Sequence, residues 1–192
     1  MIRETEKEYK FLISKETFDE VMDKCSNKYL LLERKLQINY YYDTLNNKLN
    51  EYKITVRIRK KNNDMKLQIK KHISQQNFRI DSYEYSCNIT ELPPSVKIPN
   101  FKEELILKGK LITDRIIYKC GNSSIVCLDK NTYLGTTDYE VEIEVTEDEE
   151  IYILKDIEYL CLEGMGVQSK SSRFFEKLKQ QKSSLEGVEN EN

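Results

Sequence analysis

The segment Glu6-Lys7-Glu8-Tyr9-Lys10, near the N-terminus, decides the fold expected for the whole chain. In an extended strand successive side chains point to opposite faces, so Glu6, Glu8 and Lys10 share one face. Neighbours on that face lie about 6.7 Å apart, because a strand rises about 3.3 Å per residue. Two carboxylates at this spacing can converge on one divalent cation or flank a pair of them, and hard ions such as Mg²⁺ prefer carboxylate oxygens. The segment therefore indicates a strand with a candidate metal site, with positive charge expected opposite its like charges.

The composition limits the class of protein. The chain has 192 residues, of which 39% are hydrophobic and 33% charged, as expected for one domain or one domain with a tail. Its 31 Lys and Arg residues nearly balance 33 Asp and Glu residues, so a nucleic-acid partner is not indicated. The chain has no apolar run near the ~18 residues of a membrane span and no signal-peptide core. We therefore expect a cytoplasmic protein with neither a nucleic-acid nor a membrane partner.

Two common kinds of site do not fit the sequence. The five cysteines include no C-x-x-C pair and there is a single histidine, so a zinc site is disfavoured and reduced thiols are expected. There is also no G-x-x-x-x-G-K-[ST] segment, the P-loop that binds nucleotide phosphates through its backbone. Any phosphate group would therefore have to be bound by side chains.

Hydrophobic periodicity and turn residues predict an α+β protein that is rich in strands. Strands are expected at about residues 2–13, 37–44, 54–60, 65–71, 78–89, 115–119, 125–129 and 138–145, and helices at about 16–26, 147–162 and 169–179. Ser14 is the expected N-cap of the first helix. The second helix should bury Ile151, Leu154, Ile157, Leu160 and Cys161. Prolines near residue 94 interrupt the pattern, and residues 100–110 are expected to be helical or irregular.

Like charges recur on one face of several predicted strands, whereas the opposite faces are apolar. The repeated sets are Arg57 and Arg59; Lys66 and Lys70; Arg115 and Lys119; and Glu140, Glu142 and Glu144. An antiparallel sheet with one solvated face is the simpler explanation, but solvated faces usually mix the two signs of charge. The amphipathic helices also need apolar surface to cover. If they cover the apolar sheet face, the charged faces line the interior of a barrel.

The order of these residues resembles the CYTH, or triphosphate tunnel metalloenzyme, superfamily. The E-x-E-x-K segment is followed, in the family's order, by Tyr41-Tyr42-Asp43-Thr44, Arg57-x-Arg59, Leu67-Gln68-Ile69-Lys70, Arg115, Leu128-Asp129, Glu140-x-Glu142 and Gln168-Ser169-Lys170. The match is most similar to small single-domain bacterial members. It implies an eight-stranded antiparallel barrel with a charged lumen and flanking helices over residues 1–175, followed by a helical or mobile tail over residues 176–192.

The resemblance also implies roles for individual residues. The implied ligands of Mg²⁺ or Mn²⁺ are Glu6, Glu8, Glu140, Glu142 and Glu144. The implied triphosphate-binding residues are Lys10, Arg57, Arg59, Lys70, Arg115 and Lys170, of which Lys10 and Lys170 are also the candidates for a catalytic role. Weaker candidates, better explained as supporting ion-pair partners, are Lys66, Arg79, Glu84, Lys119 and Asp129.

The function that the resemblance implies is metal-dependent hydrolysis of a small triphosphate-bearing substrate. Inorganic tripolyphosphate, cleaved to pyrophosphate and phosphate, is the leading expectation. Thiamine triphosphatase and adenylate cyclase activities remain alternatives within the same fold, and a non-catalytic polyphosphate- or nucleotide-binding module is an alternative of another class. Two acidic pairs favour an enzyme, because binding phosphate needs only the cations. A monomer or a homodimer is expected.

Overall fold

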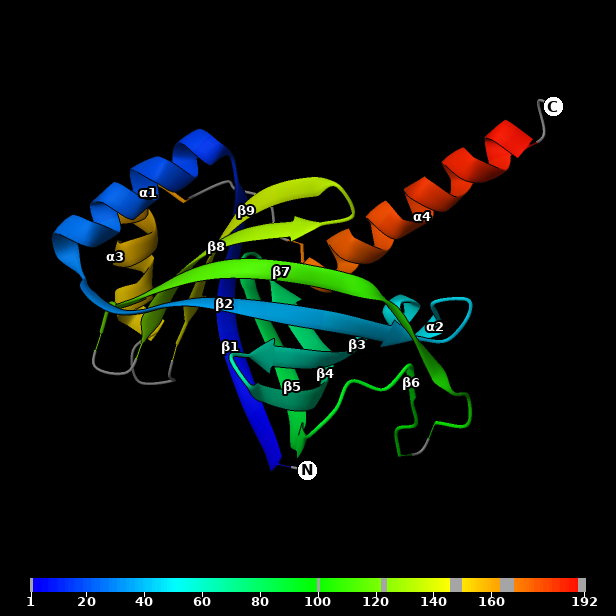
Figure 1. Ribbon diagram of the computed structural model, residues 1–192. Helices are drawn as coiled ribbons and strands as arrows, with labels where there is room; N and C mark the ends of the chain where they lie inside the picture. The colour runs from blue at the N-terminus through cyan, green and yellow to red at the C-terminus, as the bar shows by residue number, and fades with distance from the viewer. Residues whose placement is uncertain (1, 100, 122–123, 146–149, 163–167, 190–192) are drawn as a thin grey trace.

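The computed structural model describes residues 2–99, 101–121, 124–145, 150–162 and 168–189 (Figure 1). The described part of the chain folds into nine strands and four helices. In chain order they are β1 (Ile2–Ile13), α1 (Lys15–Lys28), β2 (Leu30–Asp43), α2 (Lys48–Glu51), β3 (Ile54–Lys61), β4 (Asp64–Gln76), β5 (Arg79–Ile89), β6 (Ser95–Val96), β7 (Leu105–Lys119), β8 (Ile125–Tyr133), β9 (Thr136–Glu144), α3 (Glu150–Leu160) and α4 (Lys170–Glu189). Among the described helices, none combines the length and the apolar character that crossing a membrane would require.

The strands form one antiparallel sheet that closes on itself. Its order is β2-β3-β4-β5-β1-β9-β8-β7-β6, and β2 also pairs with β7, which joins eight strands into a barrel. The closing pair is long, running from Leu30 opposite Lys119 to Asp43 opposite Ile106. The short β6 lies outside the closed ring and pairs only with the start of β7. The predicted α+β fold with an eight-stranded antiparallel barrel is therefore confirmed.

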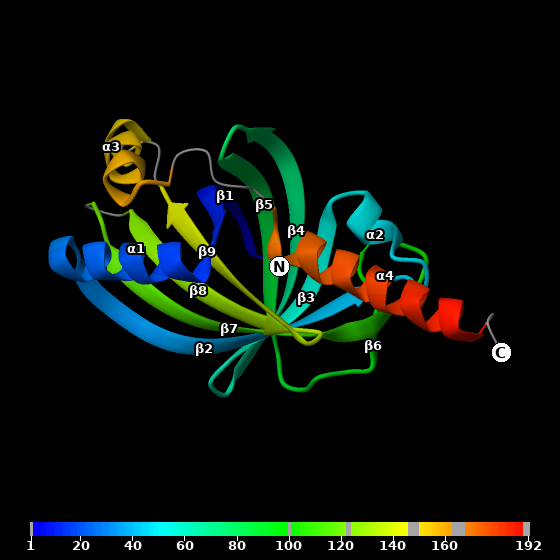
Figure 2. The same ribbon diagram turned by 90° about the horizontal axis from the view of Figure 1, so that it is seen from above.

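The helices lie at two ends of the barrel, with α1 and α3 at one end and α2 and α4 at the other (Figure 2). Helix α1 begins as predicted, because the Ser14 side chain accepts a hydrogen bond from the Thr17 backbone N–H at 3.1 Å. Its buried residues pack with Phe11 of β1 and Ile157 of α3 in the largest apolar cluster. Helices α1 and α3 therefore cover apolar outer surface of the sheet, which leaves the charged faces for the lumen.

Helix α4 covers the other end of the barrel through two aromatic residues. Phe174 and Phe175 pack against Tyr41 of β2 and Leu111 of β7. The strand makes room for this contact at Gly109, because a Cβ atom there would lie 2.9 Å from Cζ of Phe174. Gly109 also has φ +145°, a backbone conformation that residues with a Cβ rarely adopt. This close approach brings the first turn of α4 to the lumen.

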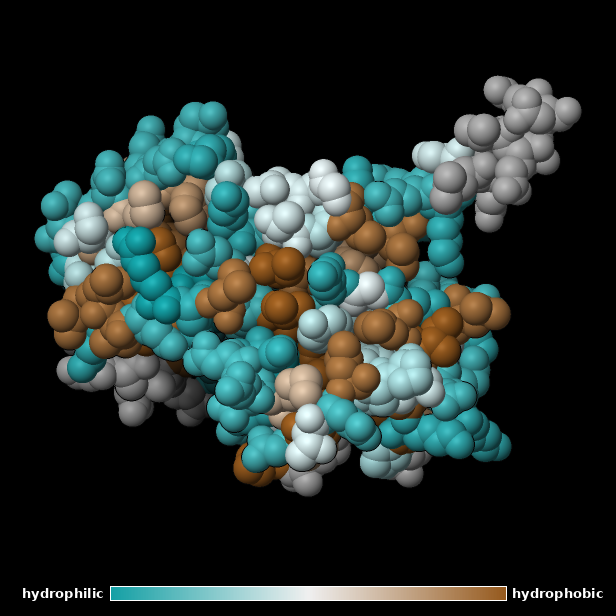
Figure 3. Space-filling model, viewed as in Figure 1, coloured by the Kyte–Doolittle hydropathy of each residue, from teal (hydrophilic) through white to brown (hydrophobic). Residues whose placement is uncertain are grey.

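Strands β2 and β7 begin earlier than the sequence pattern predicts. Residues 105–110, expected to be helical or irregular, belong to β7, and residues 30–36 belong to β2. Leu30, Leu31 and Leu36 are exposed, so burial does not alternate along this part of the chain. Figure 3 shows hydrophobic areas among hydrophilic ones on one face of the molecule. The strand conformation here comes from the β2–β7 pairing, which a local pattern does not reveal.

The two C-terminal helices also differ in part from the prediction. In α3, Ile157 and Leu160 are buried as expected, but Leu154 is 63% exposed and Cys161 is exposed. The helix begins at Glu150, and the predicted start at Glu147 and the Ile151 side chain lie outside the described residues. Helix α4 runs from Lys170 to Glu189, well past the predicted end at residue 179. Its sequence is rich in Lys, Gln, Glu and Leu, which propagate a helix until a breaker intervenes.

The buried carboxylate of Asp43 fixes the loop after β2. Asp43 is 0% exposed and accepts hydrogen bonds from the backbone N–H groups of Thr44 at 2.7 Å, Leu49 at 2.9 Å and Asn50 at 3.0 Å. The same loop contains Lys53 in the left-handed region, at φ 55°. Such a conformation costs free energy in a residue with a side chain, so the surrounding contacts must hold it. Asp43 supplies three hydrogen bonds to the backbone of this loop.

We expect Asp43→Ala to lower the free energy of unfolding by about 3 kcal/mol, because hydrogen bonds to a charged group are lost and buried N–H groups are left unpaired. Urea unfolding monitored by circular dichroism measures the change. Asp114→Ala, at an exposed position on β7, is the matched control and should change the unfolding midpoint little. An equal midpoint for both variants would mean that Asp43 does not hold the loop.

Candidate active site

The lumen of the barrel contains a cavity of about 210 Å³, lined mainly by charged and polar side chains. On the same measure a single water molecule needs only about 10–15 Å³, so the cavity is large enough for a small ligand. Side chains that line it come from seven strands and from the start of α4, among other segments. They include Glu6, Glu8, Lys10, Arg57, Arg59, Lys70, Arg115, Glu142, Glu144 and Lys170.

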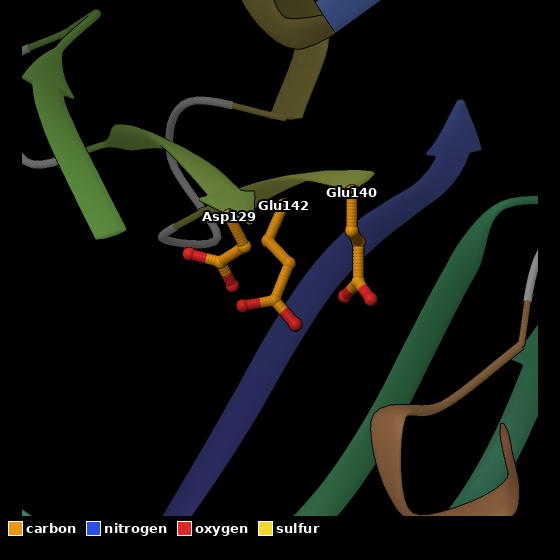
Figure 4. Close-up of side chains that lie close together, drawn as sticks. All are labelled: Asp129, Glu140 and Glu142. Atoms are coloured by element: carbon orange, nitrogen blue, oxygen red, sulfur yellow. The ribbon is translucent and has the colours of Figure 1, made fainter. Parts of the chain in front are cut away.

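Carboxylates gather on one wall of the lumen, formed by β1, β8 and β9. Asp129, Glu140 and Glu142 each offer an oxygen atom, and these atoms lie within 4.8 Å of one another. All three side chains point to the same side of the sheet, toward the interior (Figure 4). Asp129 and Glu140 are 0% exposed and Glu142 is 4% exposed. We call Asp129, Glu140 and Glu142 the carboxylate cluster.

Two lysines neutralise the carboxylate cluster. The Nζ atom of Lys170 lies 2.8 Å from Asp129, 2.8 Å from Glu140 and 2.9 Å from Glu142. Lys10 forms ion pairs with Glu142 and, at 3.0 Å, with Glu8. Burial opposes the charged form of each lysine, yet the neighbouring carboxylates raise the pKa of Lys10 well above its usual value and also raise the pKa of Lys170. Both lysines are therefore fixed positive charges rather than proton acceptors at neutral pH.

Glu6 and Glu8 share a third lysine. Lys70 on β4 lies 2.5 Å from Glu6 and 2.6 Å from Glu8. Burial disfavours the charged form of Glu8, but Lys10 and Lys70 outweigh it and lower the pKa of Glu8 to about 2. Because of these lysines, Glu8 is ionised at neutral pH.

Three arginines also lie in the lumen, two on β3 and one on β7, the neighbour of β8. Arg115 makes two hydrogen bonds to Asp129, at 2.7 and 2.6 Å, and also contacts Glu142. Arg57 is held by Gln68 at 2.9 Å and by Glu84 at 3.2 Å. Arg59 contacts the neutral Asn39 at 2.8 Å, and burial together with Arg57 and Arg115 lowers its pKa to about 10. We call Arg57, Arg59 and Arg115 the arginine wall.

The donor set of the carboxylate cluster fits a hard divalent ion. All its ligand atoms are carboxylate oxygens, and Mg²⁺ and Mn²⁺ favour such oxygens. The Nζ atom of Lys170 already lies between the three carboxylates, so the space among them suits a cation. The lumen thus has a buried acidic cluster that can hold a metal ion, with Glu6 and Glu8 on the adjacent strand β1.

The remaining predicted residues fall into two groups. Glu144 lies at the edge of the cavity and contacts Arg115 at 3.4 Å, while Glu84 and Asp129 lie in the lumen as ion-pair partners of arginines. The other three lie away from the buried contacts. Lys66 and Lys119 are exposed, and Arg79, opposite Tyr9 on the outer face of β5, pairs with Asp81 at 2.9 Å.

Several lumen residues were not singled out by the sequence. Arg173, one helical turn after Lys170, contacts Asp138 at 2.8 Å and Glu140 at 2.5 Å. Its i+3 spacing from Lys170 is the signal that could have placed it on the same helix face. Gln37 and Asn39 also point into the lumen, and their alternation with apolar residues along β2 could have shown this.

The comparisons with known proteins agree with this fold. A model of the CYTH domain matches residues 4–175, and no curated protein sequence matches the chain. A putative adenylate cyclase from Bacillus halodurans is 25% identical with a TM-score of 0.73, covering 91% of this chain and 100% of that one. A putative adenylyl cyclase from Hippeastrum, described as having a dominant triphosphatase activity, is 21% identical with a TM-score of 0.71, covering 89% and 95%.

A more distant structure has the same fold. The capping enzyme triphosphatase of Mimivirus is 12% identical with a TM-score of 0.54, covering 82% of this chain and 89% of that one. The matched family model spans all the strands of the barrel and the first turns of α4. The chain therefore belongs to the CYTH domain family.

Proposed function

We propose that this protein is a divalent-metal-dependent triphosphatase, with inorganic tripolyphosphate as its leading substrate. The observation that carries the proposal is that one lumen holds both the carboxylate cluster and the arginine wall, with Arg115 in contact with the cluster. Cations alone would suffice to bind a phosphate chain. The buried carboxylates would repel a bound phosphate chain unless a metal ion lay between the two. Their presence therefore favours a metal-dependent enzyme over a module that only binds phosphate.

The residues divide the work between binding and charge stabilisation. Arg57, Arg59 and Arg115 present planar guanidinium groups, which suit the oxygens of phosphoryl groups. Lys10 and Lys170 stay protonated and are placed to stabilise negative charge that develops on the transferred phosphoryl group. Asp129, Glu140 and Glu142, with Glu6 and Glu8, would hold the Mg²⁺ or Mn²⁺. When bound, the ion neutralises phosphate charge and orients a water molecule for in-line attack.

The substrate class follows from the width of the cationic surface. The arginines and lysines come from separate strands, so a chain of three phosphoryl groups pairs with more of them than pyrophosphate does. Among the described lining residues the aromatic side chains are Tyr41, which is buried against Phe174, and His72. Tyr41 is 0% exposed and offers no free ring face for an adenine base, since stacking needs an accessible ring, and His72 is half-buried. This favours inorganic tripolyphosphate over ATP.

We expect kcat/KM to be higher for tripolyphosphate than for ATP, and to be very low for pyrophosphate. Losing one partner of a buried, hydrogen-bonded charge pair costs roughly 2–5 kcal/mol, which penalises the shorter substrate. The test measures kcat/KM for tripolyphosphate, ATP, thiamine triphosphate and pyrophosphate with Mg²⁺ and with Mn²⁺. No turnover of any of them would contradict the proposal and favour a binding module.

Adenylate cyclase is the second candidate, because the 25% identical Bacillus halodurans structure is described as a putative adenylate cyclase. Product analysis separates the two activities. Orthophosphate is the product expected of a triphosphatase, and cyclic AMP with pyrophosphate is that of a cyclase. If ATP gives the highest kcat/KM and cyclic AMP forms, the cyclase assignment replaces the triphosphatase.

A further inference from the structure

Strand β2 places two buried amides on the lumen face, and their hydrogen-bonding atoms are largely unpartnered. Gln37 and Asn39 are both 0% exposed. Neither the amide nitrogen nor the amide oxygen of Gln37 has a partner among the described residues, and the same holds for the amide nitrogen of Asn39. A buried polar group without a partner is costly, so these donors point to something that accepts hydrogen bonds from them.

Cations surround these amides. In the strand register Gln37 lies opposite Lys61 and Asn39 lies opposite Arg59. On the other side of β2, Lys35 lies opposite Arg115, so two like charges face each other across a strand pair. Like charges in this position repel, and the repulsion is relieved when an anion lies near both.

Two of the cations lack an acidic partner. Arg115 pairs with Asp129, and Lys35 pairs with Glu33 at 2.7 Å. Within the described ranges neither Arg59 nor Lys61 forms an ion pair with a carboxylate; Arg59 contacts Asn39 instead. Burial and the charges of Arg59, Lys35, Arg115 and Arg57 lower the pKa of Lys61 to about 8. This part of the lumen is therefore electropositive and short of acceptors.

We propose that Gln37, Asn39, Arg59 and Lys61 form an anion subsite that binds the terminal phosphoryl group of the substrate. Arg115 contacts the cluster on one side and faces Lys35 on the other, so it links the two regions. The assignment of the bound phosphoryl group to a triphosphate substrate rests on the proposed function. A phosphoryl group fits because its several oxygens can accept from two amides, a guanidinium and an ammonium at once.

The first test is direct binding, which needs no turnover. Isothermal titration calorimetry with inorganic phosphate and with tripolyphosphate, both without metal, compares wild type with Lys61→Gln and Gln37→Leu. We expect each variant to weaken binding of both ligands by about 10-fold or more, the effect of losing one charge-assisted or buried hydrogen bond. Lys60→Gln, at the exposed neighbouring position on the other face of β3, is the matched control and should bind as wild type does.

The two variants distinguish a specific binding site from general electrostatic attraction of the anion. Gln37→Leu keeps the net charge, so a loss of affinity in this variant requires the amide itself. Unchanged affinity in Gln37→Leu would overturn the subsite, because only diffuse electrostatic attraction by the lysine would remain. Lys61→Gln also removes one charge from the crowded cations, so we expect the ligand-free variant to unfold at a higher temperature than wild type, which separates weaker binding from a failure to fold.

The second test assigns the bound group to the substrate. We expect Lys61→Gln to raise KM for tripolyphosphate by about 10-fold while the Lys60→Gln control leaves it unchanged. If inorganic phosphate binding weakens but this KM does not change, the subsite binds released phosphate and its assignment to the substrate end is wrong. If no substrate turns over but tripolyphosphate binding still depends on Lys61 and Gln37, the triphosphatase proposal fails and the subsite stands.

Discussion

Replacement of Glu142 by glutamine is expected to reduce turnover of tripolyphosphate by about 10³-fold or more, the effect of losing several kcal/mol of charge stabilisation. Glu142 belongs to the carboxylate cluster and contacts Lys10, Lys170 and Arg115. Because it is only 4% exposed, its charge also balances these three buried cations. We therefore expect the variant to lose about 3 kcal/mol of stability as well, as when one partner of a buried ion pair is removed.

A comparison with Glu6→Gln separates the loss of activity from the loss of stability. The Glu6 side chain is 36% exposed and pairs only with Lys70 among the ion pairs of the described residues. Its removal should therefore change the free energy of unfolding little but should still reduce turnover strongly. Turnover is measured at saturating Mg²⁺ and Mn²⁺, below the unfolding temperature of each variant. Wild-type turnover in either variant would remove that residue from the proposed metal site.

Tripolyphosphate together with Mg²⁺ or Mn²⁺ is expected to raise the melting temperature by about 5–10 °C at a concentration 100 times Kd. Binding to the folded state alone then adds about 2.7 kcal/mol, and 1 kcal/mol shifts the melting temperature of a chain of this size by about 2–4 °C. The physical reason is the crowding of like charges on the arginine wall, which a bound anion relieves. Scanning calorimetry measures the shift.

The control for this experiment is sodium chloride at the same ionic strength. Salt screens exposed charges but reaches buried ones much less, so it should shift the melting temperature far less than the ligand does. Pyrophosphate with the same metal gives a second comparison and should produce an intermediate shift. Equal shifts from tripolyphosphate and from sodium chloride would show that general screening, rather than a specific site, is responsible.

The charged lumen could be predicted from the sequence because the alternation of side chains between the two faces of a strand is a local property. Glu6, Glu8 and Lys10 share a face in any extended strand, and the same holds for Glu140, Glu142 and Glu144. Closure of the barrel followed from a second local signal, the amphipathic helices that need apolar sheet surface. These two periodicities indicated a barrel with a charged lumen as an alternative to a sheet with one solvated face, and the resemblance to the CYTH superfamily implied the eight strands and the roles of the charged residues.

What the sequence did not predict depends on contacts between distant segments. The first part of β2 has exposed leucines and becomes a strand only because it pairs with β7, some 80 residues later in the chain. Arg173 enters the lumen because Gly109 lets Phe174 approach the barrel, which no local pattern around residue 173 contains. Arg79 lies on the outer face because the register between β5 and β1 decides which residues of β5 face the lumen.

The position of Lys170 has a consequence for ion selectivity in the proposed metal site. Its ammonium group lies between the three carboxylates and is tethered there by α4, so any ion that enters competes with a built-in cation. A tethered group acts at an effective concentration in the millimolar range or above. A monovalent ion from solution brings no more charge than the ammonium and gains nothing by the exchange. A divalent ion brings twice the charge of the ammonium group. Competition with Lys170 therefore makes the site select divalent over monovalent ions.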